Sequence, residues 1–308
     1  MIRILGTIFA GLLGLAFGSF LNVCLSRWPA GESIVRPRSH CRQCNRTLAW
    51  WENVPLVSWL ALRGRCRTCR TWIGWRYLLV ELAVGALWAT ETWQSFRPEL
   101  LSMPTLPTDD FWFYFGHGVF QMVLFWLLIA LAVLDAEHYW LPDWLTWPGA
   151  GLGVITRLLI VFYIFSMNQV DWSCIDLPGF DRFCKFGPVW LLLDPILDAI
   201  LAAALILLIR WIYWLIRRRE GIGLGDAKLM ALLAAWLGFP QALLAFGLGV
   251  VLGALVAVVL LIVPSARRGS ESWALSKLPL GTFLCIGGII SSLWGQPILA
   301  EYLRWAGF

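Results

Sequence analysis

Long apolar runs follow one another along most of the chain, separated by shorter polar connections. They cover residues 4–25, 77–93, 111–134, 144–166, 189–216, 226–238, 241–264 and 279–299. Because a helix needs about 20 apolar residues to cross the hydrocarbon layer of a membrane, these runs predict about eight transmembrane helices. The second and sixth runs are short. The pattern therefore predicts an all-α polytopic membrane protein.

Composition supports this class. The chain is 59% hydrophobic and only 14% charged, whereas about a quarter of the residues in soluble domains are charged. The net charge of +5 comes from arginines that lie in loops beside the apolar runs, where they set membrane orientation. We therefore expect the lipid bilayer as a partner, and no nucleic acid.

The polar loop from Arg27 to Arg76 contains ten arginines and only two acids. The positive-inside rule places such a loop in the cytoplasm and the N-terminus outside. Counting onward puts the basic loops at 217–220 and 265–272 inside as well. A cleaved signal peptide is the competing interpretation of the first apolar run, but it would export the arginine-rich loop.

Four cysteines in this loop form two C-x2-C pairs, Cys41 with Cys44 and Cys66 with Cys69. Two such pairs can supply four thiolates at tetrahedral positions, which is typical of a structural zinc site. A loop of this size with few core-forming side chains needs such a staple to fold. Two disulfides, or an iron–sulfur centre, are the alternatives.

The other four cysteines give weaker indications of a role. Cys24 and Cys285 are expected to be buried apolar residues. Cys174 and Cys184 lie in the outer loop 171–188, where an oxidising compartment would allow them to form a disulfide; the alternative is that both stay free.

These observations divide the chain into five segments. They are a first span (1–26), a cytoplasmic zinc loop with four cysteines (27–76), a second span with an outer loop (77–110), a six-span core (111–299) and a C-terminal tail (300–308).

Two aspartates lie at the edges of apolar runs. Asp135 ends the third run, and Asp226 opens the sixth in the stretch GIGLGDAKLM. A carboxylate at membrane depth is costly, so each calls for a partner or a function. Two carboxylates at one depth suit aspartic hydrolysis, in which one activates water and the other donates a proton. Gly221, Gly223 and Gly225 would allow an irregular backbone beside Asp226.

Simpler roles remain open for these acids. Asp226 can cap the following helix by accepting N–H groups from AKLM, and Asp143, which follows Pro142, has a still stronger capping interpretation. Asp135 can be an interfacial acid paired with Lys228 or an arginine.

Taken together, these stretches resemble the type IV prepilin peptidases, the bifunctional leader peptidases and N-methyltransferases also grouped as GxGD aspartic proteases. The resemblance rests on five ordered blocks: GSFLNVCLSRWP, the cysteine pairs with their flanks, WRYLLVEL, LDAEHYWLPDWLTWP and GLGDAKLMALLAAWLG. It departs at LPLGTFLCIGG (278–288), where the family has a proline-containing block.

The resemblance implies an activity and its residues. Asp135 and Asp226 match the catalytic aspartates, and Cys41, Cys44, Cys66 and Cys69 match the zinc ligands. It implies cleavage of prepilins or pseudopilins after the glycine that ends a basic leader, followed by N-methylation from S-adenosylmethionine. The expected location is the bacterial inner membrane, with the active site facing the cytoplasm.

The N-methyltransferase activity, which the resemblance associates with the loop 27–76, has weaker support than the peptidase activity. The sequence has no G-x-G-x-x-G after a strand. Asn22, Glu81 and Gly85 are candidates by position, and interhelical hydrogen bonding or close helix packing is the alternative for each. A proton- or ion-coupled transporter that uses the same carboxylates is the main rival function, and a non-catalytic assembly factor is a second.

Overall fold

The structure is a computed structural model that describes residues 2–96, 111–166, 188–219, 223–262 and 278–307. Within these ranges it consists of helices and two isolated β-bridges, with no strand. The long helices are α1 (Ile2–Arg27), α3 (Trp75–Ser95), α5 (Phe111–His138), α6 (Asp143–Ser166), α7 (Pro188–Arg217), α8 (Leu224–Leu237), α9 (Phe239–Ile262) and α10 (Leu280–Trp305). Two short helices, η1 (Trp50–Asn53) and α2 (Val57–Ala61), lie between α1 and α3.

Every predicted apolar run coincides with one of these long helices, which confirms the all-α membrane class. Six of the helices are long and apolar enough to span a membrane. The other two, α3 and α8, are the runs that are short in the sequence. With 14 residues α8 is roughly 21 Å long, less than the ~30 Å hydrocarbon layer, so eight crossings is only an approximate count.

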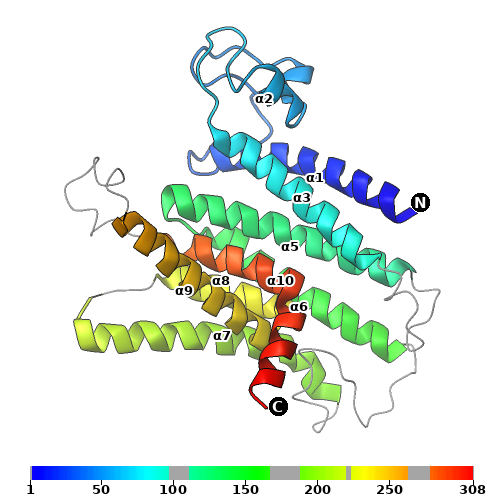
Figure 1. Ribbon diagram of the computed structural model, residues 1–308, viewed down its shortest axis with the longest axis vertical. Helices are drawn as coiled ribbons and strands as arrows, with labels where there is room; N and C mark the ends of the chain where they lie inside the picture. Colours follow the sequence, from blue (N-terminus) through cyan, green and yellow to red (C-terminus); the bar gives the residue numbers. More distant parts are fainter. Residues whose placement is uncertain (1, 97–110, 167–187, 220–222, 263–277, 308) are drawn as a thin grey trace. The chain divides into compact units, whose positions relative to one another are not determined.

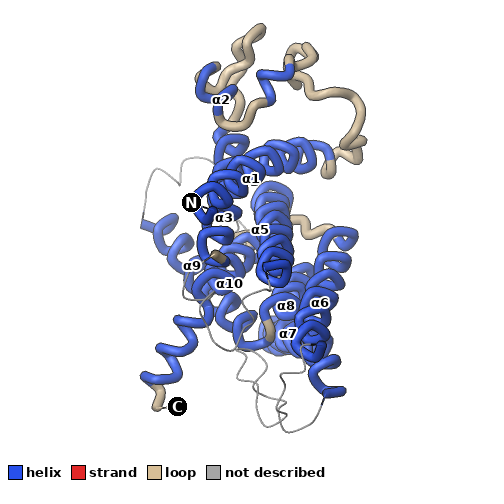
Figure 2. The backbone as a smooth tube through the Cα atoms, turned by 90° about the vertical axis from the view of Figure 1, so that its right-hand side faces the viewer, coloured by secondary structure: helices blue, strands red, loops and turns tan. Residues whose placement is uncertain are grey.

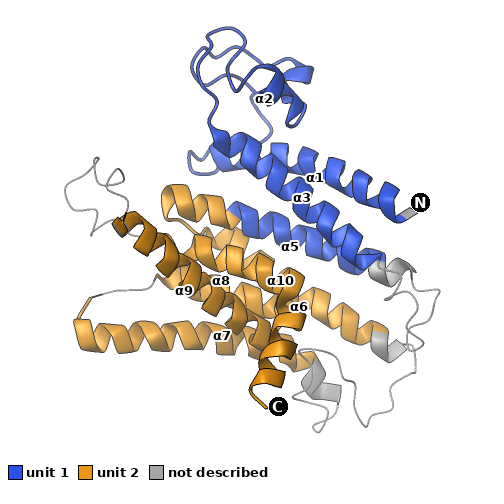
Figure 3. Ribbon diagram, in the orientation of Figure 1, with its two compact units in different colours: residues 1–130 blue, residues 131–308 orange. Residues whose placement is uncertain are grey.

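The chain forms two compact units, residues 1–130 and residues 131–308, and the boundary falls within α5 (Figure 3). In unit 1, α1 packs along α3 (Figure 1). Glycines permit this close approach: a Cβ placed on Gly14 would lie 2.9 Å from the Cα of Gly85. Small residues at a helix contact are typical of membrane proteins, where close van der Waals packing holds helices together.

In unit 2, α8 is the central helix. It contacts α6, α7, α9 and α10, which lie around it in both views (Figures 1 and 2). Ten of its 14 residues are buried, so it is covered on all sides. A helix that is apolar all round belongs inside a bundle, which explains why so short a helix is stable here.

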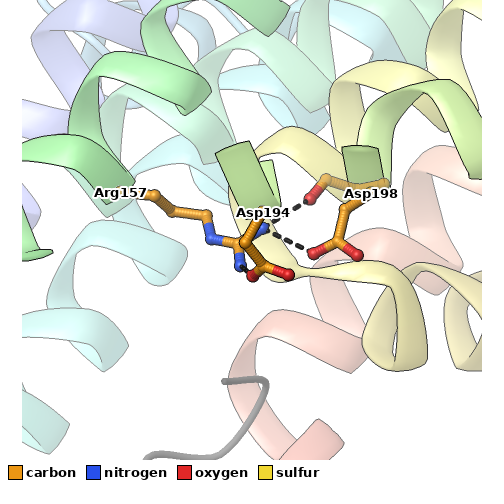
Figure 4. A network of polar contacts seen from close by, with 4 residues as sticks. Arg157, Asp194 and Asp198 are labelled. Carbon is orange, nitrogen blue, oxygen red and sulfur yellow. Dashed lines mark hydrogen bonds and ion pairs between the residues drawn. The ribbon is translucent and has the colours of Figure 1, made fainter. Parts of the chain in front are cut away.

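A buried ion cluster joins three helices of unit 2 (Figure 4). The guanidinium of Arg157, on α6, lies 2.5 Å from Asp194 Oδ2 and 2.8 Å from Asp198 Oδ2, both on α7. It also donates to the carbonyl of Ala234 in the last turn of α8, at 3.3 Å. All three charged side chains are at most 6% exposed. The cluster therefore ties α6 and α7 to the C-terminal end of α8.

The sequence did not predict this cluster. Asp194 and Asp198 lie four residues apart in an apolar run and therefore share one helix face, which is a signal in the sequence for a buried partner of opposite charge. Cys174 and Cys184 lie outside the described residues, which include only the last residue of the loop 171–188.

We expect Arg157→Met to destabilise the protein by about 3–5 kcal/mol, because it leaves two buried carboxylates without their cation. Thermal unfolding of the purified protein in detergent measures this loss. The matched control is Arg217→Met, which removes an exposed arginine of α7 and should change stability little.

A triple variant tests the cause. Arg157→Met combined with Asp194→Leu and Asp198→Leu should recover most of the lost stability, because no unpaired charge remains. Equal destabilisation by the single and triple variants would show that packing, and not charge pairing, is the contribution of Arg157.

Candidate functional site

Asp135 lies near the C-terminal end of α5 and is 7% exposed. Its Oδ2 accepts the backbone N–H of Thr282 at 2.7 Å and lies 3.2 Å from the Thr282 hydroxyl oxygen. The same hydroxyl lies 3.0 Å from the carbonyl of Ala132, one turn before Asp135. Thr282 therefore contacts both the carboxylate and the helix that carries it.

The position of Thr282 explains why it can hold a carboxylate. α10 begins at Leu280, directly after Pro279, so Thr282 lies in the first turn. The first N–H groups of a helix have no partner within it, and the positive end of the helix dipole favours an anion there. The role of Thr282 was not predicted from the sequence. The stretch Pro-Leu-Gly-Thr at the start of an apolar run was the available signal for a helix start at this position.

Asp226 lies in the first turn of α8 and is 8% exposed. Its Oδ2 accepts the backbone N–H of Gly223, the residue before the helix, at 3.1 Å. Gly223 has an extended backbone and no side chain with which to cap the helix. Asp226 therefore does stabilise the start of a helix, but by bonding backward, and not by accepting N–H groups from AKLM as the capping interpretation proposed.

The glycine pattern is only partly as expected. Gly223 lies outside the helix, whereas Gly225 is helical and adds no irregular backbone. Gly221 falls outside the described residues. Gly225 has a different role, since a Cβ there would lie 3.0 Å from Leu141 Cδ1.

Leu141 packs against the first turns of both α8 and α10. A Cβ on Gly281 of α10 would lie 3.1 Å from Leu141 Cδ1, the atom that a Cβ on Gly225 of α8 would meet at 3.0 Å. Asp226 directly follows Gly225, and Asp135 accepts the N–H of Thr282 in the first turn of α10, so the structure brings the two predicted aspartates to one region of unit 2. The Cβ on Gly281 would also lie only 2.9 Å from Asp135 Oδ2. Glycine at 281 thus leaves room for the carboxylate.

The alternative pairing of Asp135 with Lys228 is not observed. The ammonium of Lys228 on α8 instead pairs with Asp143, the first residue of α6. The Asp143 side chain is 62% exposed, in contrast to the buried Asp135 and Asp226. Asp143 therefore links α6 to α8 at a more exposed position.

The four predicted cysteines, Cys41, Cys44, Cys66 and Cys69, come together in unit 1. Their sulfur atoms all lie within 4.8 Å of one another, and those of Cys41 and Cys69 are 3.7 Å apart. Four sulfurs at 2.3 Å from a tetrahedral zinc ion would be about 3.8 Å apart. The cluster therefore fits a zinc ion, and its four ligands would leave no open coordination position.

The two C-x2-C pairs fold in the same way. The N–H of Cys41 donates to the carbonyl of Arg46 at 2.9 Å, and that of Cys66 donates to Thr71 at 2.9 Å. In each turn the fifth residue, Asn45 or Arg70, has a positive φ near 55°. This local repeat, not recognised in the sequence, aims both sulfurs of each pair at one point.

Polar contacts support the cysteine loop. Glu52, whose side chain is 1% exposed, pairs with Arg46 at 2.6 Å and accepts the N–H of Ala49 at 2.7 Å. The hydrogen bond from Arg46 lowers the pKa of Glu52. Hydrogen bonds from the backbone N–H groups of Cys69 and Thr68 lower the pKa of Cys66 to about 6.

The three candidate residues for methyl transfer do not all lie together. Gly85 lies in the close contact of α1 with α3, as the packing alternative proposed. Asn22 and Glu81 line a cavity of unit 1.

The sequence matches two family models. Residues 12–95 match the bacterial peptidase A24 N-terminal domain, and residues 122–179 and 182–258 match the type IV leader peptidase family. The resemblance found in the sequence is thereby confirmed. No solved structure matches the chain.

Curated relatives match along nearly their whole length. A prepilin leader peptidase/N-methyltransferase of Stutzerimonas stutzeri is 31% identical, over 96% of this chain and 93% of its own. Proteins of the same name from Pseudomonas aeruginosa and Pseudomonas putida are 32% and 34% identical, over 96% and 97% of this chain and 93% and 94% of theirs. This chain therefore belongs to the type IV leader peptidase family and is a peptidase.

Proposed function

We propose that this peptidase is a membrane aspartic endopeptidase that removes the basic leader of type IV prepilins or pseudopilins after a glycine. The observation that carries the proposal is the pair of buried carboxylates, Asp135 and Asp226, each bonded by a backbone N–H at the start of a helix. The substrate class comes from the relatives, which are named prepilin leader peptidases.

The chemistry follows from two like charges in a shielded site. Such a pair shares one proton, so one carboxylate is a base and the other an acid. The base takes a proton from water as its oxygen attacks the scissile carbonyl carbon, and the acid protonates the carbonyl oxygen. As the C–N bond breaks, the carboxylic acid formed from the base gives its proton to the leaving amine. A hydroxyl of the tetrahedral intermediate returns a proton to the other carboxylate as the new carboxyl group forms, so the pair again shares one proton. Water is the nucleophile, so no acyl-enzyme forms.

The chain's own backbone would orient these groups. Thr282 and Gly223 each donate a backbone N–H to one carboxylate and hold it in place. Fixed hydrogen bonds of this kind lower the cost of arranging charge when the reaction takes place.

We place the site on the cytoplasmic side of a bacterial inner membrane. The ten arginines between Arg27 and Arg76 favour that side for the cysteine loop. A basic leader would stay there for the same reason.

A second activity is part of the proposal, because the relatives are also named N-methyltransferases. After cleavage the chain would methylate the new N-terminal residue, with S-adenosylmethionine supplying the methyl group. Cys41, Cys44, Cys66 and Cys69 would hold a structural zinc ion. Ion-coupled transport, the rival function, has no need of this cysteine cluster.

Asp135→Asn and Asp226→Asn should each lower leader cleavage by at least a thousandfold, because an amide can neither accept the proton of water nor replace a shared acid. Mass spectrometry of a prepilin incubated with purified protein measures cleavage. Asp143→Asn is the matched control and should cleave at nearly the wild-type rate. Cleavage by either of the first two variants would exclude the aspartic mechanism.

Gly281→Ala should lower kcat by one to two orders of magnitude with little change in KM. The added methyl group would lie 2.9 Å from Asp135 Oδ2 and must displace that carboxylate. The control is Gly247→Ala in α9, where an added Cβ meets no atom within 4 Å. Unchanged kcat in Gly281→Ala would mean that the position of Asp135 is not critical.

Cys41→Ser should lower the zinc content of the purified protein from about one ion per chain to well below half, because it removes one of four thiolate ligands. Elemental analysis measures this ratio, and limited proteolysis should show the loop 27–76 cut more rapidly. Cys24→Ala, which changes a buried cysteine of α1, should keep its zinc. A wild-type protein without zinc would contradict the site.

A further inference from the structure

The hydroxyl of Thr282, on α10, lies between two acceptors of α5. Its oxygen is 3.2 Å from Asp135 Oδ2 and 3.0 Å from the carbonyl oxygen of Ala132, one turn earlier in the helix. All three residues belong to unit 2, so the contact lies within one compact unit. A threonine hydroxyl carries a single hydrogen, so it can donate to only one of these two oxygens at a time.

Both acceptors have another donor. The backbone N–H of Thr282 already donates to Asp135 Oδ2, at 2.7 Å. The carbonyl of Ala132 lies inside α5, where a regular helix pairs it with the N–H four residues further on. Neither oxygen therefore depends on the hydroxyl of Thr282, and the hydrogen of this hydroxyl can point to one or to the other.

The proposed reaction requires Asp135 to change its charge in every cycle. As the base it gains a proton from water, and as the acid it gives a proton to the scissile carbonyl oxygen. A charged carboxylate only accepts hydrogen bonds, whereas a protonated one also donates. Surroundings that suited only one of these two forms would oppose the step that produces the other.

We propose that Thr282 is a positioning residue whose hydroxyl turns to match the proton on Asp135. When the carboxylate is charged, the hydroxyl donates to Asp135 Oδ2. When Oδ2 carries a proton, that proton is donated to the hydroxyl oxygen, and the hydroxyl donates to the carbonyl of Ala132 instead. The inference rests on the proposed aspartic mechanism and adds a residue to it.

The packing around Thr282 lets the hydrogen turn while the heavier atoms stay in place. The branched side chain of a threonine has few rotamers in a helix. Asp135 is 7% exposed and is held by a backbone N–H from the first turn of α10. The exchange therefore needs only a rotation about the Cβ–Oγ1 bond of Thr282. A polar group that is already in place lowers the cost of moving charge during the reaction.

Thr282→Val tests the hydroxyl, because valine keeps the shape of the side chain and the backbone N–H. We expect kcat for leader cleavage to fall by about tenfold to a hundredfold, since a hydrogen bond to a charged group is lost. KM should change little, because the hydroxyl contacts Asp135 and not the substrate. Thr282→Ser, which keeps the hydroxyl, should recover most of kcat. Steady-state cleavage of a prepilin by the full-length protein in detergent measures both constants.

The matched control is Thr156→Val in α6. It removes a hydroxyl of unit 2 that bonds the carbonyl of Leu152 in its own helix, at 2.8 Å, and it should leave kcat unchanged. Thermal unfolding of each variant reports whether it is folded. Thr282→Ala also lacks the hydroxyl and has a higher helix propensity, so it should show the same loss of kcat if the valine variant does not fold.

The outcomes separate this inference from the proposed function, with Asp135→Asn measured in the same assay. If Asp135→Asn is inactive and Thr282→Val has the kcat of the wild type, the inference fails and the aspartic mechanism stands; a lower unfolding temperature would then mean that Thr282 only ties α10 to α5. If Thr282→Ser is as slow as Thr282→Val, the hydroxyl is not the cause and the inference also fails. If Asp135→Asn cleaves normally, or the wild type does not cleave, the proposed mechanism fails and the inference fails with it.

Discussion

The cost of placing a carboxylate among apolar helices constrains the architecture of unit 2. A charged group in hydrocarbon must be paired, hydrogen-bonded or covered by water. Among the residues that the structure describes, Asp135 and Asp226 meet this requirement with free N–H groups at helix starts and not with cations. An arginine or lysine at the same place would fix the charge of a carboxylate, whereas a backbone N–H holds its position and leaves it able to exchange a proton.

This requirement also explains why α8 is short and central. Its first turn must present Asp226 beside Asp135, and its body must be covered on all sides. At its other end the carbonyl of Ala234 accepts a bond from Arg157, whose charge suits the negative end of a helix. Arg157 is in turn balanced by Asp194 and Asp198. The buried charge cluster thus lies at the end of α8 away from the proposed chemistry.

In unit 1 the constraint is different. The polar loop between α1 and α3 has little apolar core of its own, so other contacts must hold it together. The cysteine cluster and the Arg46–Glu52 pair provide the cross-links that a larger core would otherwise supply. Polar side chains of α1 and α3 line a cavity beside this loop.

The sequence by itself determined the helices, the class of protein, the two carboxylates and the four cysteines, because apolar run length and C-x2-C spacing are local properties of a chain. It did not predict the contact of Thr282 with Asp135, 147 positions away. Nor did it predict the Arg157 cluster, in which Asp194 and Asp198 lie 37 and 41 positions from the arginine. It also did not show that Gly225 is helical. These features depend on which helix ends and faces meet in space, and only the tertiary packing decides that.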